Sequence, residues 1–77
     1  MKTLDEFVAL FAELFEDIDI NEIKASTRFR DLEEWSSLIA LSVIAMADEE
    51  YDVTLKGDDI INSNTIEDIF NIVKKRM

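Results

Sequence analysis

Residues 35–51 read WSSLIALSVIAMADEEY, a long apolar run that begins with two serines and ends with acids and a tyrosine. This run predicts a helix that begins at Ser36 or Ser37 and ends near Tyr51. Two hydroxyls therefore stand side by side at a helix start, in a chain without His or Cys. Two interpretations are open. Either Ser37 is a site of covalent modification, or Ser36 caps the helix and Ser37 is an ordinary polar residue of its first turn.

The predicted helix is apolar around most of its circumference. The side expected to face the core carries Ala40, Val43, Ile44, Ala47 and Tyr51. The opposite side carries Leu38, Ser42, Ala45 and Glu49, flanked by Ile39, Leu41 and Met46. Such a helix is either central and covered by the preceding loop, or it presents an exposed face to a partner.

The composition indicates one small helical domain, residues 1–77, that is 48% hydrophobic with a single Gly and no Pro. Eighteen acids against eight bases give a net charge of −10, which disfavours nucleic acid and anionic membranes and favours basic protein surfaces. The absence of Cys excludes a disulfide framework and suits a reducing compartment. The sequence shows neither a signal peptide nor an apolar span of membrane length, so we expect a cytoplasmic protein.

Two further helices flank this run. The first starts at a capping box of Thr3 and Glu6 and carries one apolar stripe, which contains Leu4, Phe7, Val8, Phe11, Leu14 and Phe15. The last is predicted to start at Asn64 as its N-cap, with Glu67 three residues on. Its stripe contains Ile66, Ile69, Phe70, Ile72 and Val73, and its last turn contains Lys74, Lys75 and Arg76.

The connections between these helices are predicted to be structural. Residues 17–35 form a long loop whose apolar anchors are Ile18, Ile20, Ile23, Phe29 and Leu32. Asp17, Asp19 and Asn21 alternate as in a calcium loop, but Glu22 and Arg28 replace the required Gly and Glu, so calcium binding is not expected. Residues 52–55 are predicted to be extended, and residues 56–61 to form one short helical turn.

Most enzyme classes can be excluded from the residue types alone. Without His or Cys there is no His-based triad, no thiol nucleophile and no ordinary transition-metal site. Gly57 is isolated, so there is no Gly-rich phosphate loop. What remains is Ser37, because a helix start presents free N–H groups that stabilise a phosphate attached there.

Three stretches of the chain resemble the acyl carrier protein family of phosphopantetheine-binding carrier domains. One leads into the serines and comprises Ile23, Thr27, Phe29, Asp31 and Leu32. The second, Trp35-Ser36-Ser37-Leu38, is similar to the family's Asp-Ser-Leu motif with its preceding Trp. The third is Asp48-Glu49-Glu50-Tyr51 followed by Val53 and Leu55. The resemblance covers nearly the whole chain and implies an all-α, four-helix bundle with a long first loop and a short third helix.

The resemblance also implies a function. Ser37 would be modified with 4′-phosphopantetheine from coenzyme A by a phosphopantetheinyl transferase. The arm would carry an acyl or aminoacyl group as a thioester between partners such as a ligase, an acyltransferase or a ketosynthase. The protein would be a monomer and not itself an enzyme. Partner docking is expected at Ser36, Leu38, Ile39, Leu41, Ser42, Ala45, Asp48 and Glu49.

Two positions depart from the family's pattern. Ser36 stands where the family usually has Asp, which removes a charge that the transferase commonly uses. Ile39 and Ser42 stand where carriers of fatty acid synthesis are often acidic, which favours a dedicated partner in a specialised pathway. Two alternatives stay open: an unmodified carrier-like interaction module, and an unrelated acidic helical adaptor. A small apolar pocket among Phe29, Ile44, Ile60 and Ile66 would suit a cargo.

Overall fold

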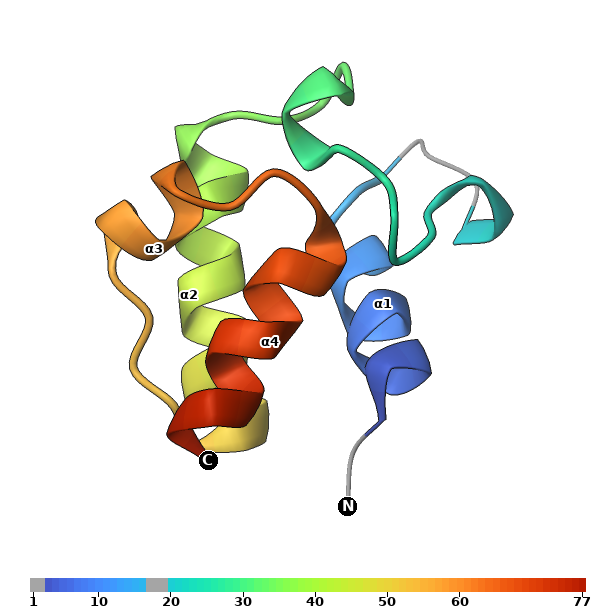
Figure 1. The fold of residues 1–77 in the computed structure, drawn as a ribbon. Coiled ribbons are helices and arrows are strands. Elements are labelled where there is room, and N and C mark those ends of the chain that lie inside the picture. Colours follow the sequence, from blue (N-terminus) through green and yellow to red (C-terminus); the bar gives the residue numbers. More distant parts are fainter. Residues whose placement is uncertain (1–2, 17–19) are drawn as a thin grey trace.

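The computed structural model of the protein describes residues 3–16 and 20–77. The described residues form four α-helices and two short 3₁₀-helices, which are, in chain order, α1 (Leu4–Ala12), η1 (Ile20–Glu22), η2 (Phe29–Asp31), α2 (Ser37–Tyr51), α3 (Gly57–Ile61) and α4 (Ile66–Arg76) (Figure 1). Within them there is no strand, only an isolated β-bridge between Arg28 and Thr65. The predicted all-α bundle with a long first loop and a short third helix is confirmed. No helix in the described part of the chain has the length and apolarity needed to cross a membrane.

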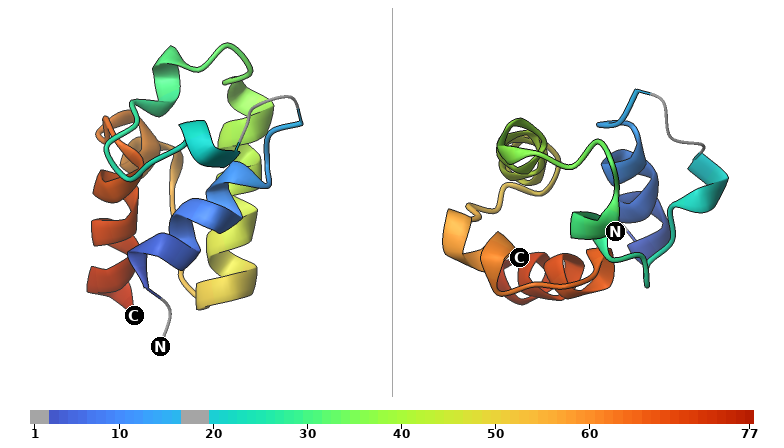
Figure 2. Two further views of the ribbon diagram at one scale, coloured as in Figure 1. Left: turned by 90° about the vertical axis from the view of Figure 1, so that its right-hand side faces the viewer. Right: turned by 90° about the horizontal axis from the view of Figure 1, so that it is seen from above.

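Helices α1, α2 and α4 surround a common apolar interior (Figure 2). Phe7 and Phe11 of α1 are fully buried. The Phe7 ring centroid lies 5.4 Å from that of Phe70 on α4 and 5.7 Å from that of Tyr51 on α2. Because burying one such side chain stabilises a fold by about 1.5–3 kcal/mol, these rings contribute strongly to the packing of the three helices.

The connection before α2 crosses one end of the bundle, and α4 ends at the other (Figures 1 and 2). Two of the anchors predicted in this connection, Ile23 and Phe29, are buried, and Leu32 is partly buried against the core. The Ile20 side chain, Ile18 and the aspartates of the calcium-like pattern lie outside the described residues. Among the described residues, no group of acids is arranged to hold a metal ion.

The first helix starts where the sequence predicts but is shorter than its apolar stripe. The Thr3 hydroxyl accepts a hydrogen bond from the Glu6 backbone N–H at 3.3 Å, which fixes the start. The helix ends at Ala12, so Leu14 and Phe15 lie in the turn that follows it. Phe15 is nevertheless buried, with its ring centroid 5.9 Å from that of Phe11, so the stripe continues as packing beyond the helix.

The predicted start of the last helix was one residue early. Thr65, not Asn64, is the N-cap of α4, and Asp68, not Glu67, completes the capping box. The Thr65 hydroxyl accepts from the Asp68 N–H at 3.2 Å, and the Asp68 carboxylate accepts from the N–H groups of Asn64 and Thr65, both at 3.0 Å. These backbone donors, that of Asn64 first, lower the pKa of Asp68. The apolar stripe of α4 is as predicted except that Ile72 is only partly buried.

Candidate functional site

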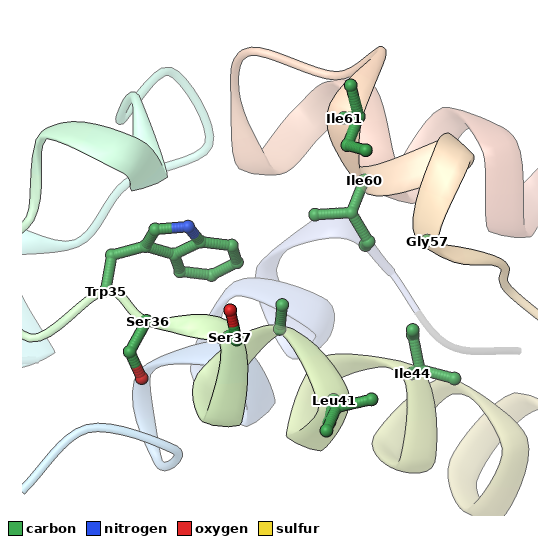
Figure 3. A pocket seen from close by; sticks show the side chains of 9 residues that line it. Trp35, Ser36, Ser37, Leu41, Ile44, Gly57, Ile60 and Ile61 are labelled. Atoms are coloured by element: carbon green, nitrogen blue, oxygen red, sulfur yellow. The ribbon is translucent and has the colours of Figure 1, made fainter.

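The two adjacent hydroxyls at the start of α2 lie in different positions. Ser36 has an extended backbone and is the N-cap, and its Oγ accepts a hydrogen bond from the Ile39 N–H at 3.3 Å. Ser37 is the first helical residue and is exposed. Its hydroxyl points into a hollow between Trp35 and α3, whereas the Ser36 hydroxyl points to the opposite side of the chain (Figure 3). Only one of the two hydroxyls is therefore turned toward the hollow.

Trp35 fixes the chain immediately before these serines. Its ring centroid lies 4.6 Å from that of Phe29 and 6.3 Å from that of Phe11, and the Phe11 ring is parallel to it. Because Phe11 and Phe29 are fully buried, this aromatic row connects the helix start to the core. In the sequence Trp35 stands out only as part of the resemblance to the family, and this anchoring role becomes visible only in the fold.

The hollow beside Ser37, which we call the Ser37 pocket, has a volume of about 380 Å³ and a mostly apolar lining. It is lined by Trp35, Ser36, Ser37, Ala40, Leu41, Ile44, Gly57, Ile60 and Ile61. The predicted pocket is thus correct for Ile44 and Ile60. It is wrong for Phe29 and Ile66, because both are fully buried in the core beneath it. Adjacent isoleucines in a five-residue helix are a sequence signal for such a wall, because they cannot both face the core.

The residues expected to dock partners divide between two faces of α2. Leu41 lines the Ser37 pocket and Leu38 follows Ser37 in the helix, and their exposed fractions are 62% and 71%. Ala45, Asp48 and Glu49 are exposed farther along the helix. The apolar start of α2 is therefore an exposed face rather than one covered by the loop.

Three of the predicted docking residues instead line a second hollow, of about 340 Å³, between α2 and the end of α1: Ser42, Ala45 and Glu49. The Ser42 hydroxyl donates to the Leu38 carbonyl at 3.1 Å, so it is engaged with its own helix. Ile39 packs partly against the core, and Met46, expected at the flank of the exposed side, is buried. Helix α2 therefore buries more of the side that faces α1 than its sequence pattern predicts.

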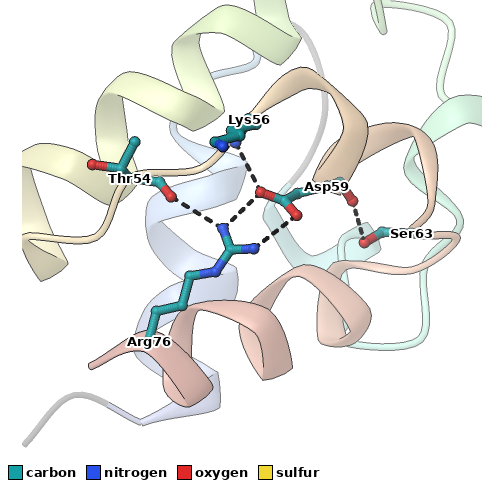
Figure 4. A network of polar contacts seen from close by, with 5 residues as sticks. All are labelled: Thr54, Lys56, Asp59, Ser63 and Arg76. Carbon is teal, nitrogen blue, oxygen red and sulfur yellow. Dashed lines mark hydrogen bonds and ion pairs between the residues drawn. The ribbon is translucent and has the colours of Figure 1, made fainter.

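Polar contacts hold the wall of the Ser37 pocket that α3 provides (Figure 4). The Asp59 carboxylate accepts from the Lys56 N–H at 2.9 Å and from two guanidinium nitrogens of Arg76 at 2.6 and 3.0 Å. The Arg76 guanidinium, followed by the Lys56 N–H, lowers the pKa of Asp59, and the carboxylate in turn raises the pKa of Arg76. In the sequence Arg76 appears only as a positive charge in the last turn of a helix, so this contact with Asp59 was not predicted.

The residues at this site do not include the groups of a His-based serine triad. The chain has no His to act as the base of a serine triad. An exposed hydroxyl at a helix start, beside an apolar pocket, is suited to hold a group attached to it by a phosphate.

Comparisons with known proteins give the family of the chain. A family model described as "Phosphopantetheine attachment site" matches residues 5–73. The chain is 24% identical over 76 residues to an acyl carrier protein of Kocuria rhizophila, an alignment that covers 95% of this chain and 94% of that protein. No solved structure matches the chain at a significant level. The match of the family model over most of the chain shows that the protein belongs to the acyl carrier protein family, whose prosthetic group is a covalently attached 4′-phosphopantetheine.

Proposed function

We propose that Ser37 is the residue that carries the 4′-phosphopantetheine arm. The observation that supports this assignment is the division of the two hydroxyls at the start of α2. Ser36 Oγ accepts from the Ile39 N–H, while the exposed Ser37 hydroxyl points into the pocket (Figure 3). A transferase must reach a free hydroxyl, and Ser37 offers one without disturbing the helix cap.

The residues around Ser37 fit the arm. The N-terminus of α2 provides backbone N–H groups and the positive end of the helix dipole for a phosphate on Ser37 Oγ. The first turn of α2 contains no acid that would repel this phosphate. The apolar residues of the Ser37 pocket would lie against the part of the arm nearest the protein. When bound, the arm supplies a terminal thiol that the chain, which has no Cys, cannot supply itself.

Members of the family interact with biosynthetic enzymes and with a phosphopantetheinyl transferase. For this chain we propose a dedicated acyl- or aminoacyl-handling partner in a specialised cytoplasmic pathway. Leu38 and Leu41 support this proposal because they expose apolar surface beside the attachment site. From Ser37 to Ala47 the helix carries no charge at all, so the partner's contact surface should be apolar in its centre. Candidate partners are a ligase, an acyltransferase or a ketosynthase.

Intact-mass measurement after incubation with a broad-specificity transferase and coenzyme A tests the attachment site. We expect a single phosphopantetheine adduct on the wild type and on Ser36→Ala. Ser37→Ala should remain unmodified. Retention of the adduct in Ser37→Ala would overturn the assignment.

Ser36 supports a second candidate function, an unmodified carrier-like module that docks a partner through α2. This residue replaces the Asp that the family usually has before the attachment Ser. If the missing charge only slows modification, Ser36→Asp should speed it roughly tenfold to a hundredfold, because a charge-assisted hydrogen bond contributes about 1.5–3 kcal/mol. If instead the native protein carries no adduct and Leu38→Asp abolishes partner binding while Ser37→Ala does not, the module is favoured. The family match excludes the unrelated adaptor.

A further inference from the structure

Helix α3 forms one wall of the Ser37 pocket yet has little packing of its own. It has five residues, of which only Ile60 is buried, and the exposed fraction of Ile61 is 69%. A helix of this length is not stable by itself in water, because a single turn gains too few hydrogen bonds to offset its ordering. Contacts from elsewhere in the chain must therefore hold α3 in place.

The N-terminal end of α3 is held by Arg76, from the last turn of α4. Its guanidinium group makes a two-point contact with the Asp59 carboxylate and also donates to the Thr54 carbonyl at 3.1 Å (Figure 4). Thr54 lies in the extended segment that leads into α3, so one side chain fixes both the helix start and the chain before it. The side-chain exposed fraction of Asp59 is only 17% although it is charged, which the contact with Arg76 allows.

The C-terminal end of α3 is held by Arg30, from η2 in the long connection. Its Nη2 donates to the backbone carbonyl of Ile60 at 2.9 Å and to that of Ile61. Carbonyls at the end of a helix lack partners within the helix, and a positive charge there also complements the dipole. The same guanidinium lies 5.1 Å from the Phe29 ring centroid, and Phe29 packs on Trp35. Arg30 thus connects the Trp35 side of the pocket to the α3 side.

We propose that Arg30 and Arg76 are positioning residues that hold α3 at a fixed distance from the start of α2 and so set the width of the Ser37 pocket. The pocket wall formed by Gly57, Ile60 and Ile61 is part of the helix whose two ends these contacts hold. What fills the pocket rests on the proposed function, in which the arm or its cargo lies there. The role of the two arginines in holding the wall does not rest on the proposed function, because every contact they make belongs to the unmodified chain.

Hydrogen–deuterium exchange on the unmodified full chain tests the first part. The Asn62 and Ser63 N–H groups donate to carbonyls of α3, at 3.0 and 3.2 Å, and therefore report its opening. We expect Arg30→Gln and Arg76→Gln each to speed exchange in residues 57–63 at least tenfold, with residues 66–76 unchanged in the same sample. Arg30→Lys, which keeps the charge without the planar guanidinium, should lie between Arg30→Gln and the wild type.

Two matched controls remove one positive charge each from the same regions, Arg28→Gln and Lys75→Gln. Both should leave exchange in residues 57–63 as in the wild type. If exchange there is unchanged in the Arg30 and Arg76 variants, or rises equally in α4, the two arginines do not position α3 and the proposal fails.

The second part is tested by the melting temperature of protein loaded with saturated chains of increasing length, each transferred from its coenzyme A derivative. In the wild type, stabilisation should grow with chain length and then level off when the pocket is full. In Arg30→Gln the gain from a chain should fall by at least half, whereas Arg28→Gln should behave as the wild type. A wild type that takes up no adduct by mass would refute the attachment proposal. An adduct whose chain stabilises neither protein, or stabilises both equally, would refute control of the pocket by Arg30.

Discussion

Helices α3 and α4 are neighbours in the chain and pack against each other, but different interactions hold them. Helix α4 buries Ile66, Ile69, Phe70 and Val73 in the core. Helix α3 buries Ile60 alone, and Arg30 and Arg76 hold its two ends. Apolar packing is insensitive to pH, whereas contacts of an arginine with a carboxylate depend on the charge of the acid. The comparison suggests that the wall of the Ser37 pocket can respond to its surroundings while the bundle beneath it stays fixed.

Truncating one isoleucine in each helix should give the largest difference between them. Ile69→Ala removes a fully buried side chain and should lower the free energy of unfolding by about 2–5 kcal/mol. Ile60→Ala should cost about 2 kcal/mol or less, because the space it leaves joins a pocket that is already open. Urea unfolding of the two variants measures both values. Equal losses would mean that α3 is as much a part of the core as α4.

Capping gives the next largest effect and concerns α4 alone. Thr65→Ala removes the hydroxyl that accepts from the Asp68 N–H and should cost about 1 kcal/mol. Asn64→Ala, one residue earlier, removes an exposed contact of Asn64 Oδ1 with Arg30 Nη1 at 3.4 Å and should cost clearly less in the same urea experiment. A larger loss of unfolding free energy in Asn64→Ala than in Thr65→Ala would indicate that Asn64 is the N-cap, as the sequence predicts.

The start of α4 shows why sequence alone places an element but not its first residue. Asn64 with Glu67 and Thr65 with Asp68 have the same spacing, so both satisfy the capping pattern. Contacts from the long connection accompany the observed start. The N–H groups of Ile66 and Glu67 donate to the carbonyls of Thr27 and Ala25, at 3.3 and 2.9 Å. These partners are about forty residues away in the chain, beyond the reach of any local pattern.

The site shows the same division between local and distant information. Local spacing limits the helix start to Ser36 or Ser37, and in the structure Ser36 is the cap and Ser37 the first helical residue. The predicted Ser37 pocket is correct only for Ile44 and Ile60, because which side chains face it depends on where α3 lies relative to α2. That position depends on Arg30 and Arg76, whose partners are 30 and 17 residues away. From sequence alone, an arginine in a loop or in the last turn of a helix is predicted to be exposed to solvent, and its distant partners become visible only in the fold.

The pH dependence of stability should separate the polar wall from the apolar core. Since the pKa of Asp59 is lowered in the folded state, chiefly by Arg76, its carboxylate stabilises the fold at pH values above the unfolded pKa of about 3.9. This contribution is lost as the pH falls through the folded value. The difference in unfolding free energy between the wild type and Asp59→Asn should therefore be full at pH 7 and should shrink below pH 4. Urea unfolding at both ends of this range measures it.

Arg76→Gln provides the control for this titration. With the guanidinium absent, Asp59→Asn should have a smaller effect at pH 7, and the pH dependence of that effect should weaken as well. A pH-independent difference between the wild type and Asp59→Asn would show that the carboxylate contributes through its shape or its neutral hydrogen bonds rather than its charge.

Gly57→Ala should have the smallest effect on the free energy of unfolding. Whether it raises or lowers that free energy is what the experiment decides. Gly57 begins α3, its φ is not positive, and a Cβ built there meets no atom within 4 Å. The added methyl should therefore raise the free energy of unfolding by about 0.4–1 kcal/mol, mainly because the unfolded chain loses freedom. Exchange in residues 57–63 should slow while exchange in α4 stays the same. If Gly57→Ala instead destabilises α3, the helix start must sample conformations that only glycine allows, and the wall would be held less firmly than the two arginines imply.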